Sequence, residues 1–101
     1  MDDKRKTARR RVLKVGKIIF ADGMRLIDCT IRDMSDTGAR LLVANAVGLP
    51  DTFHLFEKSS GMVYAASVAW RLPSAVGVKF AAPPTNIHDP VTRRFARLHF
   101  P

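Results

Sequence analysis

The sequence is poor in cysteine and histidine, the side chains that most often hold zinc or act as nucleophiles. Cys29 is the one cysteine, so an internal disulfide is excluded. Its place in an alternating apolar pattern predicts a small buried hydrophobic side chain rather than a nucleophile. His54, His88 and His99 are scattered and show no zinc-ligand spacing. We therefore expect neither a metal nor a cofactor.

Long apolar runs are also absent. No stretch approaches the roughly 18 apolar residues that a membrane-spanning helix needs. The first segment, "MDDKRKTARRR", lacks the apolar core of a signal peptide, so we expect a cytoplasmic protein. The 101 residues suffice for one domain with a modest core, and 47% hydrophobic with 26% charged residues is typical of a soluble globular chain.

The sequence lacks the marks of an enzyme. Ser35 is not in a Gly-x-Ser-x-Gly elbow and has no histidine close by in the sequence, which argues against a hydrolase. Asp33 and Asp36 are three residues apart in a turn-rich segment, and a turn or ligand contacts explain them better than paired catalytic carboxylates do. We expect a protein without catalytic activity.

Positive charge is concentrated at the start of the chain. Residues 1–17 contain eight basic residues and two aspartates, so they carry +6 of the total net charge of +8. Such a basic segment attracts phosphate groups, whether from nucleic acid, acidic lipid or a nucleotide.

Six short apolar or alternating segments predict β-strands. Gly, Pro, Asn, Asp and Ser residues separate them, and no helical pattern lies between consecutive strands. Parallel crossovers therefore have no room, and we predict an all-β fold with a six-stranded antiparallel barrel, closed or nearly so. The predicted strands are residues 12–20, 25–33, 39–44, 52–57, 62–72 and 75–81.

The two ends complete the predicted organisation. Residues 1–11 form a basic N-terminal arm, and residues 12–101 form the barrel with a short C-terminal helix at about 90–99. Asp89 before Pro90 offers a helix cap, and Val91, Phe95 and Leu98 follow at helical spacing, so this helix would cover one side or mouth of the barrel.

Two short motifs frame the first strands. In "RKTAR", Arg5 and Arg9 are four residues apart, and their guanidinium groups suit phosphate oxygens and stacking on a base. A solvated basic tail is the alternative. In "DMSDTG", a simple hairpin turn with a positive φ at Gly38 explains the glycine, but Asp33 falls on the inward phase of its strand with Cys29, where a carboxylate needs donors.

Together these motifs resemble the PilZ domain family, bacterial receptors for cyclic di-GMP. The family pattern is Arg-x-x-x-Arg ahead of the first barrel strand, then Asp/Asn-x-Ser-x-x-Gly after the second, and both are complete here. The strand count, the C-terminal helix and Trp70 at a strand end are also similar, so the resemblance covers essentially the whole chain.

The resemblance implies a ligand site. Arg5 and Arg9 would bind the phosphates of cyclic di-GMP and stack on guanine, Asp33 and Ser35 would read a guanine edge, and Gly38 would set the turn. The additional candidates are Arg10 and Lys4 beside the first motif and Trp70. Trp70 shares a phase with Val68 and packs in the core or rim, or contacts a base.

The implied mechanism is a switch in which the anionic ligand draws the arm onto the barrel and so presents a new surface to a separate protein partner. Two other functions stay open from the sequence. One is a PilZ-like adaptor that binds proteins but no nucleotide, and the other is a small basic barrel that binds RNA or DNA through its arm.

Overall fold

The computed structural model describes residues 10–20, 25–89 and 92, and these residues form β-strands joined by short turns. Each of the six predicted strands is present, and a two-residue β7 (Thr85–Asn86) was not predicted. The predicted helix at about 90–99 and the arm that carries Arg5 and Arg9 lie outside these residues. The six main strands are β1 (Arg10–Ile19), β2 (Leu26–Met34), β3 (Gly38–Leu42), β4 (Thr52–Glu57), β5 (Met62–Leu72) and β6 (Ala75–Phe80).

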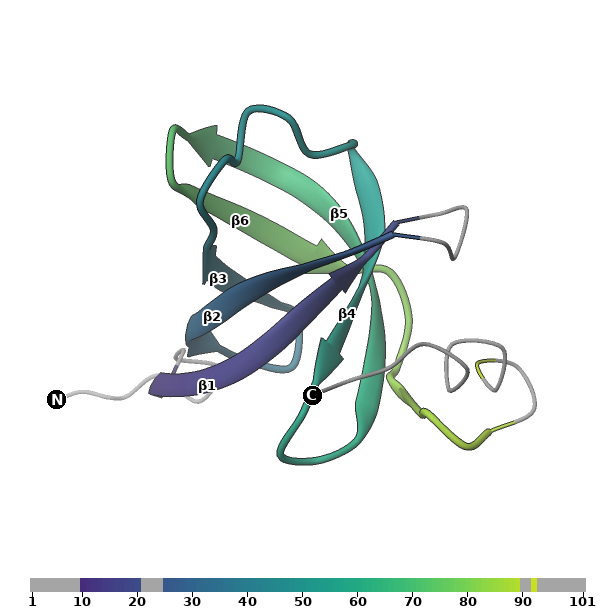
Figure 1. The fold of residues 1–101 in the computed structure, drawn as a ribbon. Helices are drawn as coiled ribbons and strands as arrows, with labels where there is room; N and C mark the ends of the chain where they lie inside the picture. Colours follow the sequence, from purple (N-terminus) through teal and green to yellow (C-terminus); the bar gives the residue numbers. More distant parts are fainter. Residues whose placement is uncertain (1–9, 21–24, 90–91, 93–101) are drawn as a thin grey trace, which may run out of the picture.

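The six main strands close into an antiparallel barrel, as predicted from the sequence. The hydrogen-bonded order is β4-β1-β2-β3-β6-β5, and β4 pairs with β5 to complete the circle. Figure 1 shows the long strands β1 and β2 crossing one side of the barrel, with β5 and β6 on the other side. Closure leaves none of the six main strands as an unpaired edge, which removes the tendency of exposed edges to associate.

Alternate side chains of the strands fill the interior. Ile18, Ile31, Leu41, Leu55 and Val76 are each fully buried at 0% exposure. Burial of a side chain of this size contributes about 1.5–3 kcal/mol, so this layer is the main source of stability. Cys29 belongs to the same cluster, which confirms that it is buried as predicted, and this burial raises the pKa of its thiol to about 12.

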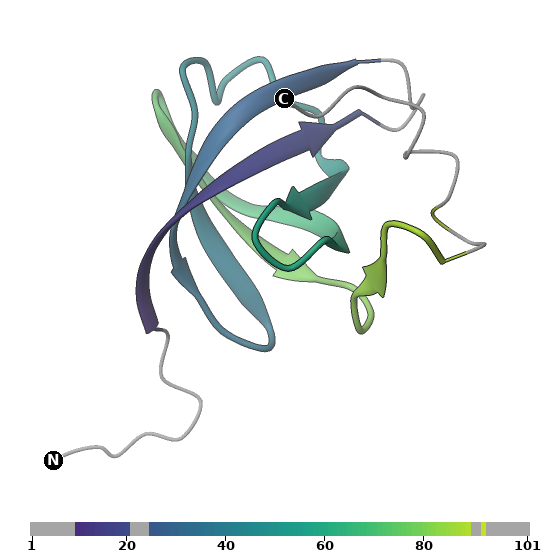
Figure 2. The ribbon, with the colours of Figure 1, turned by 60° about the horizontal axis from the view of Figure 1, so that its bottom comes forward.

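A second, smaller apolar cluster lies on the outside of the barrel. Ile19 on β1, Phe56 on β4 and Val63 on β5 are buried there together with Ile87, which follows β7. Figure 2 shows the segment after β6 running along the outside of the barrel. The two-residue β7 pairs with the start of β5 and so holds Ile87 against this cluster.

Arg71 holds the long loop between β3 and β4. Its Nη1 donates to the carbonyl oxygens of Ala46 (2.9 Å) and Leu49 (2.7 Å), and its Nη2 donates to Asp51 Oδ1 (2.7 Å). Ala46 and Leu49 are buried, and the guanidinium supplies a donor to both carbonyls, in addition to the Leu49 amide, which donates to the Ala46 carbonyl at 3.3 Å.

Candidate functional site

Asp33 does not lie on the inner face of β2, and the prediction that it does is wrong. Toward β3, Ile31 pairs with Leu41 and Asp33 pairs with Arg40, so one extra residue, Arg32, bulges out of β2. Such a bulge shifts the side-chain alternation by one position. The inward series that includes Ile31 is therefore continued by Met34, which packs against the core, and Asp33 turns to the outer face.

On the outer face, Asp33 pairs with an arginine from the next strand. Arg40 Nε donates to Asp33 Oδ2 at 2.7 Å, and the two residues are direct cross-strand partners. Their side chains are 39% (Arg40) and 20% (Asp33) exposed, so the ion pair is partly shielded from water. Arg40 was not predicted as a site residue, although it lies only two residues after Gly38.

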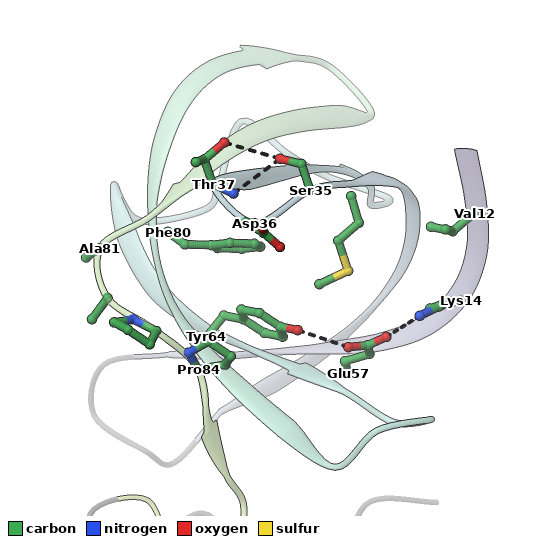
Figure 3. A pocket seen from close by; sticks show the side chains of 13 residues that line it. Val12, Lys14, Ser35, Asp36, Thr37, Glu57, Tyr64, Phe80, Ala81 and Pro84 are labelled. Atoms are coloured by element: carbon green, nitrogen blue, oxygen red, sulfur yellow. Dashed lines mark hydrogen bonds and ion pairs between the residues drawn. The ribbon is translucent and has the colours of Figure 1, made fainter. Parts of the chain in front are cut away.

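Ser35 organises the turn between β2 and β3. Its amide donates to the Gly38 carbonyl at 2.9 Å, and its Oγ accepts a hydrogen bond from the Thr37 amide at 3.2 Å. Ser35 Oγ also lies 3.2 Å from Thr37 Oγ1 (Figure 3). The serine of the second motif is thus held by bonds within its own turn, as its residue types indicate.

Gly38 is required for a different reason from the one predicted. Among the described residues the positive φ belongs to Gly61, at 74°, so the expected positive φ at Gly38 is wrong. A Cβ on Gly38 would instead lie 2.3 Å from the carbonyl oxygen of Val78 on β6. The glycine allows β3 and β6 to approach closely at the end of the turn.

Trp70 lies on the outer face of the barrel, although the sequence alternation predicted that it would share a face with Val68. Val68 pairs with Val78 and Trp70 pairs with Gly77, so Ala69 is an extra residue that shifts the alternation of β5. A Cβ on Gly77 would lie 2.2 Å from Trp70 Nε1, which shows that the indole covers this glycine. Trp70 is 40% exposed, so its position agrees with rim packing and leaves part of the ring open to solvent.

Two bulges therefore bring site residues from four strands into one row on the outer face. Asp33 on β2 lies opposite Arg40 on β3, Arg40 lies opposite Gly77 on β6, and Gly77 lies opposite Trp70 on β5. Beside this row is a shallow hollow of about 350 Å³, whose lining includes Ser35, Gly38 and Trp70. The surface combines an acceptor, a cation and an exposed ring.

The first strand begins beside the same motif. The backbone of Arg10 pairs with Met34, and the backbone of Arg11 pairs with Asp33. The predicted site residues Lys4, Arg5 and Arg9 lie outside the described residues, but the chain that carries them joins β1 at this point.

A larger pocket, of about 800 Å³, opens on the inner side of the same turn. Figure 3 shows Lys14, Glu57 and Tyr64 at one side of it, linked by dashed lines. Lys14 Nζ lies 2.6 Å from Glu57 Oε2, and Tyr64 donates its hydroxyl to Glu57 Oε1 at 3.2 Å. Ser60 Oγ also donates to Glu57 Oε1, at 2.8 Å, so the buried carboxylate is well supplied with donors.

These contacts shift two pKa values in opposite directions. Burial alone would raise the pKa of Glu57, but the hydrogen bonds and charge of Lys14, with further bonds from Ser60 and Tyr64, hold it below 4.5. Burial, then the charge of Glu57 and the bond to it, raise the pKa of Tyr64 to about 12. The sequence analysis did not predict this network, although Lys14 lies on the same face of β1 as Val12 and Ile18, which pack in the core.

The described residues contain no helix long and apolar enough to span a membrane. Within the same part of the chain, no group of three or more His, Cys, Asp or Glu side chains is arranged to hold a metal ion.

Comparison with known proteins supplies the remaining evidence. The sequence matches no curated protein. A comparison with protein-family models matches the PilZ domain over residues 3–97, nearly the whole chain. Because this match covers nearly the whole chain, the barrel is closed and the sequence contains both family motifs, the chain belongs to the PilZ domain family.

Proposed function

We propose that this protein is a non-catalytic receptor for cyclic di-GMP. The observation that supports this most directly is the register of β1 against β2. Arg10 and Arg11 pair with Met34 and Asp33, so the residues that follow the Arg-x-x-x-Arg motif lie alongside the start of the Asp-x-Ser-x-x-Gly motif. This register supports the proposal, because the strand that continues from the first motif starts beside Asp33 of the second motif.

Each motif has a distinct task in this proposal. Asp33 and Ser35, held by the sheet and its turn, accept hydrogen bonds from the N1–H and amino group of guanine. Arg5 and Arg9 bind the phosphates and stack on the base, with Arg10 and Lys4 as further cations. Trp70 offers an exposed ring face to a base at the other end of the row.

The hydrogen bonding of Ser35 supports binding rather than catalysis. Its Oγ bonds within the turn to Thr37 and Gly38, which is the pattern of a structural serine and not of an activated nucleophile. In this proposal the ligand is bound and released without chemical change, and it acts as a signal.

The expected affinity follows from an approximate balance. Ordering about five arm residues costs on the order of 5–10 kcal/mol. Several charge-assisted hydrogen bonds, at roughly 1.5–3 kcal/mol each, and base stacking exceed this cost. We expect a dissociation constant near or below about 1 μM.

Calorimetric titration with cyclic di-GMP tests the proposal, with GMP and cyclic GMP as control ligands. Arg9→Ala and Asp33→Ala should each abolish or greatly weaken binding. Arg25→Ala is a matched control, because Arg25 is exposed and lies over the Phe20 ring, 4.6 Å from its centroid, at the other end of β2. A lack of saturable binding at tens of micromolar would contradict the proposal and favour a protein-binding adaptor.

We further propose that binding moves the arm and that a separate protein reads the change. Leu13 and Val15, on β1 just after the arm, are 77% and 58% exposed and give this partner an apolar contact surface. Trypsin cleavage at the arm's basic residues should slow when the protein is saturated with cyclic di-GMP. An unchanged cleavage rate at saturation would show that the arm does not respond.

Binding of RNA or DNA is the alternative that the basic arm keeps open. Its affinity would fall steeply with salt concentration and would depend little on Asp33. Titration of Asp33→Ala with single-stranded and duplex oligonucleotides at two salt concentrations separates the two functions.

A further inference from the structure

Arg40 is in direct contact with Asp33, and this contact fixes the position of the carboxylate. Arg40 Nε lies 2.7 Å from Asp33 Oδ2, and the pair is set by direct register between β2 and β3. Arg40 alternates with Ala39 and Leu41, which are buried in the core, so its backbone is fixed by packing on the inner side of the sheet.

The geometry leaves both partners with unused hydrogen-bonding capacity. A carboxylate has about four lone-pair sites, and the contact with Nε uses one of them. The carboxylate can thus be held by Arg40 and still accept the two hydrogen bonds that a guanine edge offers. Without Arg40, a side chain that is only 20% exposed would lose a charged partner and would be free to change rotamer.

We propose that Arg40 is a positioning residue, which holds the Asp33 carboxylate in the orientation that selects guanine. The inference rests on the proposed function, because it concerns how Asp33 reads the base. It predicts that Arg40 affects selectivity between bases, and not only the general attraction of an anionic ligand.

Two neutral substitutions separate positioning from charge. Glutamine carries its amide nitrogen on Cδ, the same carbon that carries Nε in arginine, so Arg40→Gln keeps an N–H donor near Asp33. Arg40→Met has a similar length and no donor. Arg25→Gln removes the same charge at the other end of β2 and corrects for the loss of long-range attraction.

The measurement is the affinity of each variant for cyclic di-GMP and for cyclic di-AMP. Adenine lacks the N1–H and the 2-amino group of guanine that Asp33 would bind. Arg40→Met should weaken cyclic di-GMP binding by about 10- to 100-fold and reduce its preference over cyclic di-AMP. Arg40→Gln should recover at least about 5-fold of this loss and keep the preference, because its donor still holds Asp33.

Several results would overturn the inference. Equal affinities of Arg40→Gln and Arg40→Met would show that charge, and not the donor at Nε, is what matters. Tighter binding by Arg40→Met would show that Arg40 competes with the ligand for Asp33. If Arg40→Met does not give a cooperative thermal unfolding transition, Arg40→Gln decides alone, since loss of its base preference contradicts positioning.

The wild-type titration keeps this inference distinct from the proposed function. Wild-type binding with an unaffected Arg40→Met contradicts the role of Arg40 alone. Absence of wild-type binding contradicts the receptor function and the role of Arg40 together.

Discussion

The indole of Trp70 covers Gly77 on the neighbouring strand, and a Cβ at Gly77 would lie 2.2 Å from Trp70 Nε1. The pair is a direct cross-strand contact between β5 and β6 on the outer face of the barrel. Because Trp70 is partly exposed, its position depends more on the absence of a side chain at Gly77 than on burial. This dependence makes the pair open to a simple test.

Gly77→Ala should displace the indole from the sheet. Trp70 is the only tryptophan in the sequence, so the emission spectrum reports this movement directly, and we expect a shift to longer wavelength. If Trp70 contacts a base, the affinity for cyclic di-GMP should fall as well. An unchanged spectrum would mean that the ring does not rest on Gly77.

Gly38→Ala should destabilise the fold more than Gly77→Ala does. The new Cβ would lie 2.3 Å from the Val78 carbonyl oxygen, and backbone moves less readily than the edge of an exposed ring. We expect a loss of about 1–3 kcal/mol in the free energy of unfolding, measured by urea denaturation. Gly48→Ala is the control, since its Cβ would meet the Asn45 side chain at 3.2 Å and this side chain can shift. Equal losses of unfolding free energy for Gly38→Ala and Gly48→Ala would contradict the close approach of β3 and β6.

Arg71→Met should destabilise the protein by removing the hydrogen bonds that hold the loop between β3 and β4. The Leu49 carbonyl would lose its guanidinium donor, and the Ala46 carbonyl would keep only the bond from the Leu49 amide, at an expected cost of about 1–3 kcal/mol in the free energy of unfolding. Asp51→Ala removes the other partner of Arg71, but the Asp51 side chain is 94% exposed, so its loss should cost no more than about 1 kcal/mol. Comparable losses for the two variants would show that the ion pair, and not the carbonyl contacts, matters most.

The stability of the barrel should fall in acid partly through Glu57. Its pKa in the folded protein is below its usual value of 4.5, so the unfolded chain binds a proton first as the pH decreases. The stabilisation is present above pH 4.5 and is lost as the pH falls through the lower folded pKa. The difference in urea midpoint between wild type and Glu57→Gln should therefore become smaller as the pH falls below 4.5.

Asp36→Asn serves as the matched control in this pH series, because Asp36 is an exposed carboxylate. The difference in urea midpoint between wild type and Asp36→Asn should change less with pH than the difference between wild type and Glu57→Gln. A constant gap between wild type and Glu57→Gln at all pH values would rule out a contribution from ionisation of Glu57.

Much of the fold could be predicted from the sequence. The six strands follow from apolar alternation and turn residues, and short connections leave antiparallel closure as the solution. The turn at Ser35 is equally local, because its hydrogen bonds join residues at most three positions apart. Features of this kind depend on neighbours in the chain, and residue type alone determines them.

The face on which Asp33 and Trp70 lie was decided only by the tertiary structure. Alternation grouped Asp33 with Cys29 on the inward phase and Trp70 with Val68, but bulges at Arg32 and Ala69 moved both residues to the outer face. A bulge depends on the register of the adjacent strand, so local periodicity does not reveal it. The same register sets Arg40 beside Asp33.

The sequence by itself determined the family, the barrel and the chemical types of the candidate ligand-binding residues. Tertiary structure decided which side chains meet: Arg40 with Asp33, Trp70 with Gly77, and Lys14 with Glu57. The physical reason is distance along the chain, because these pairs join residues 7 to 43 positions apart and form only when strands align in the closed barrel.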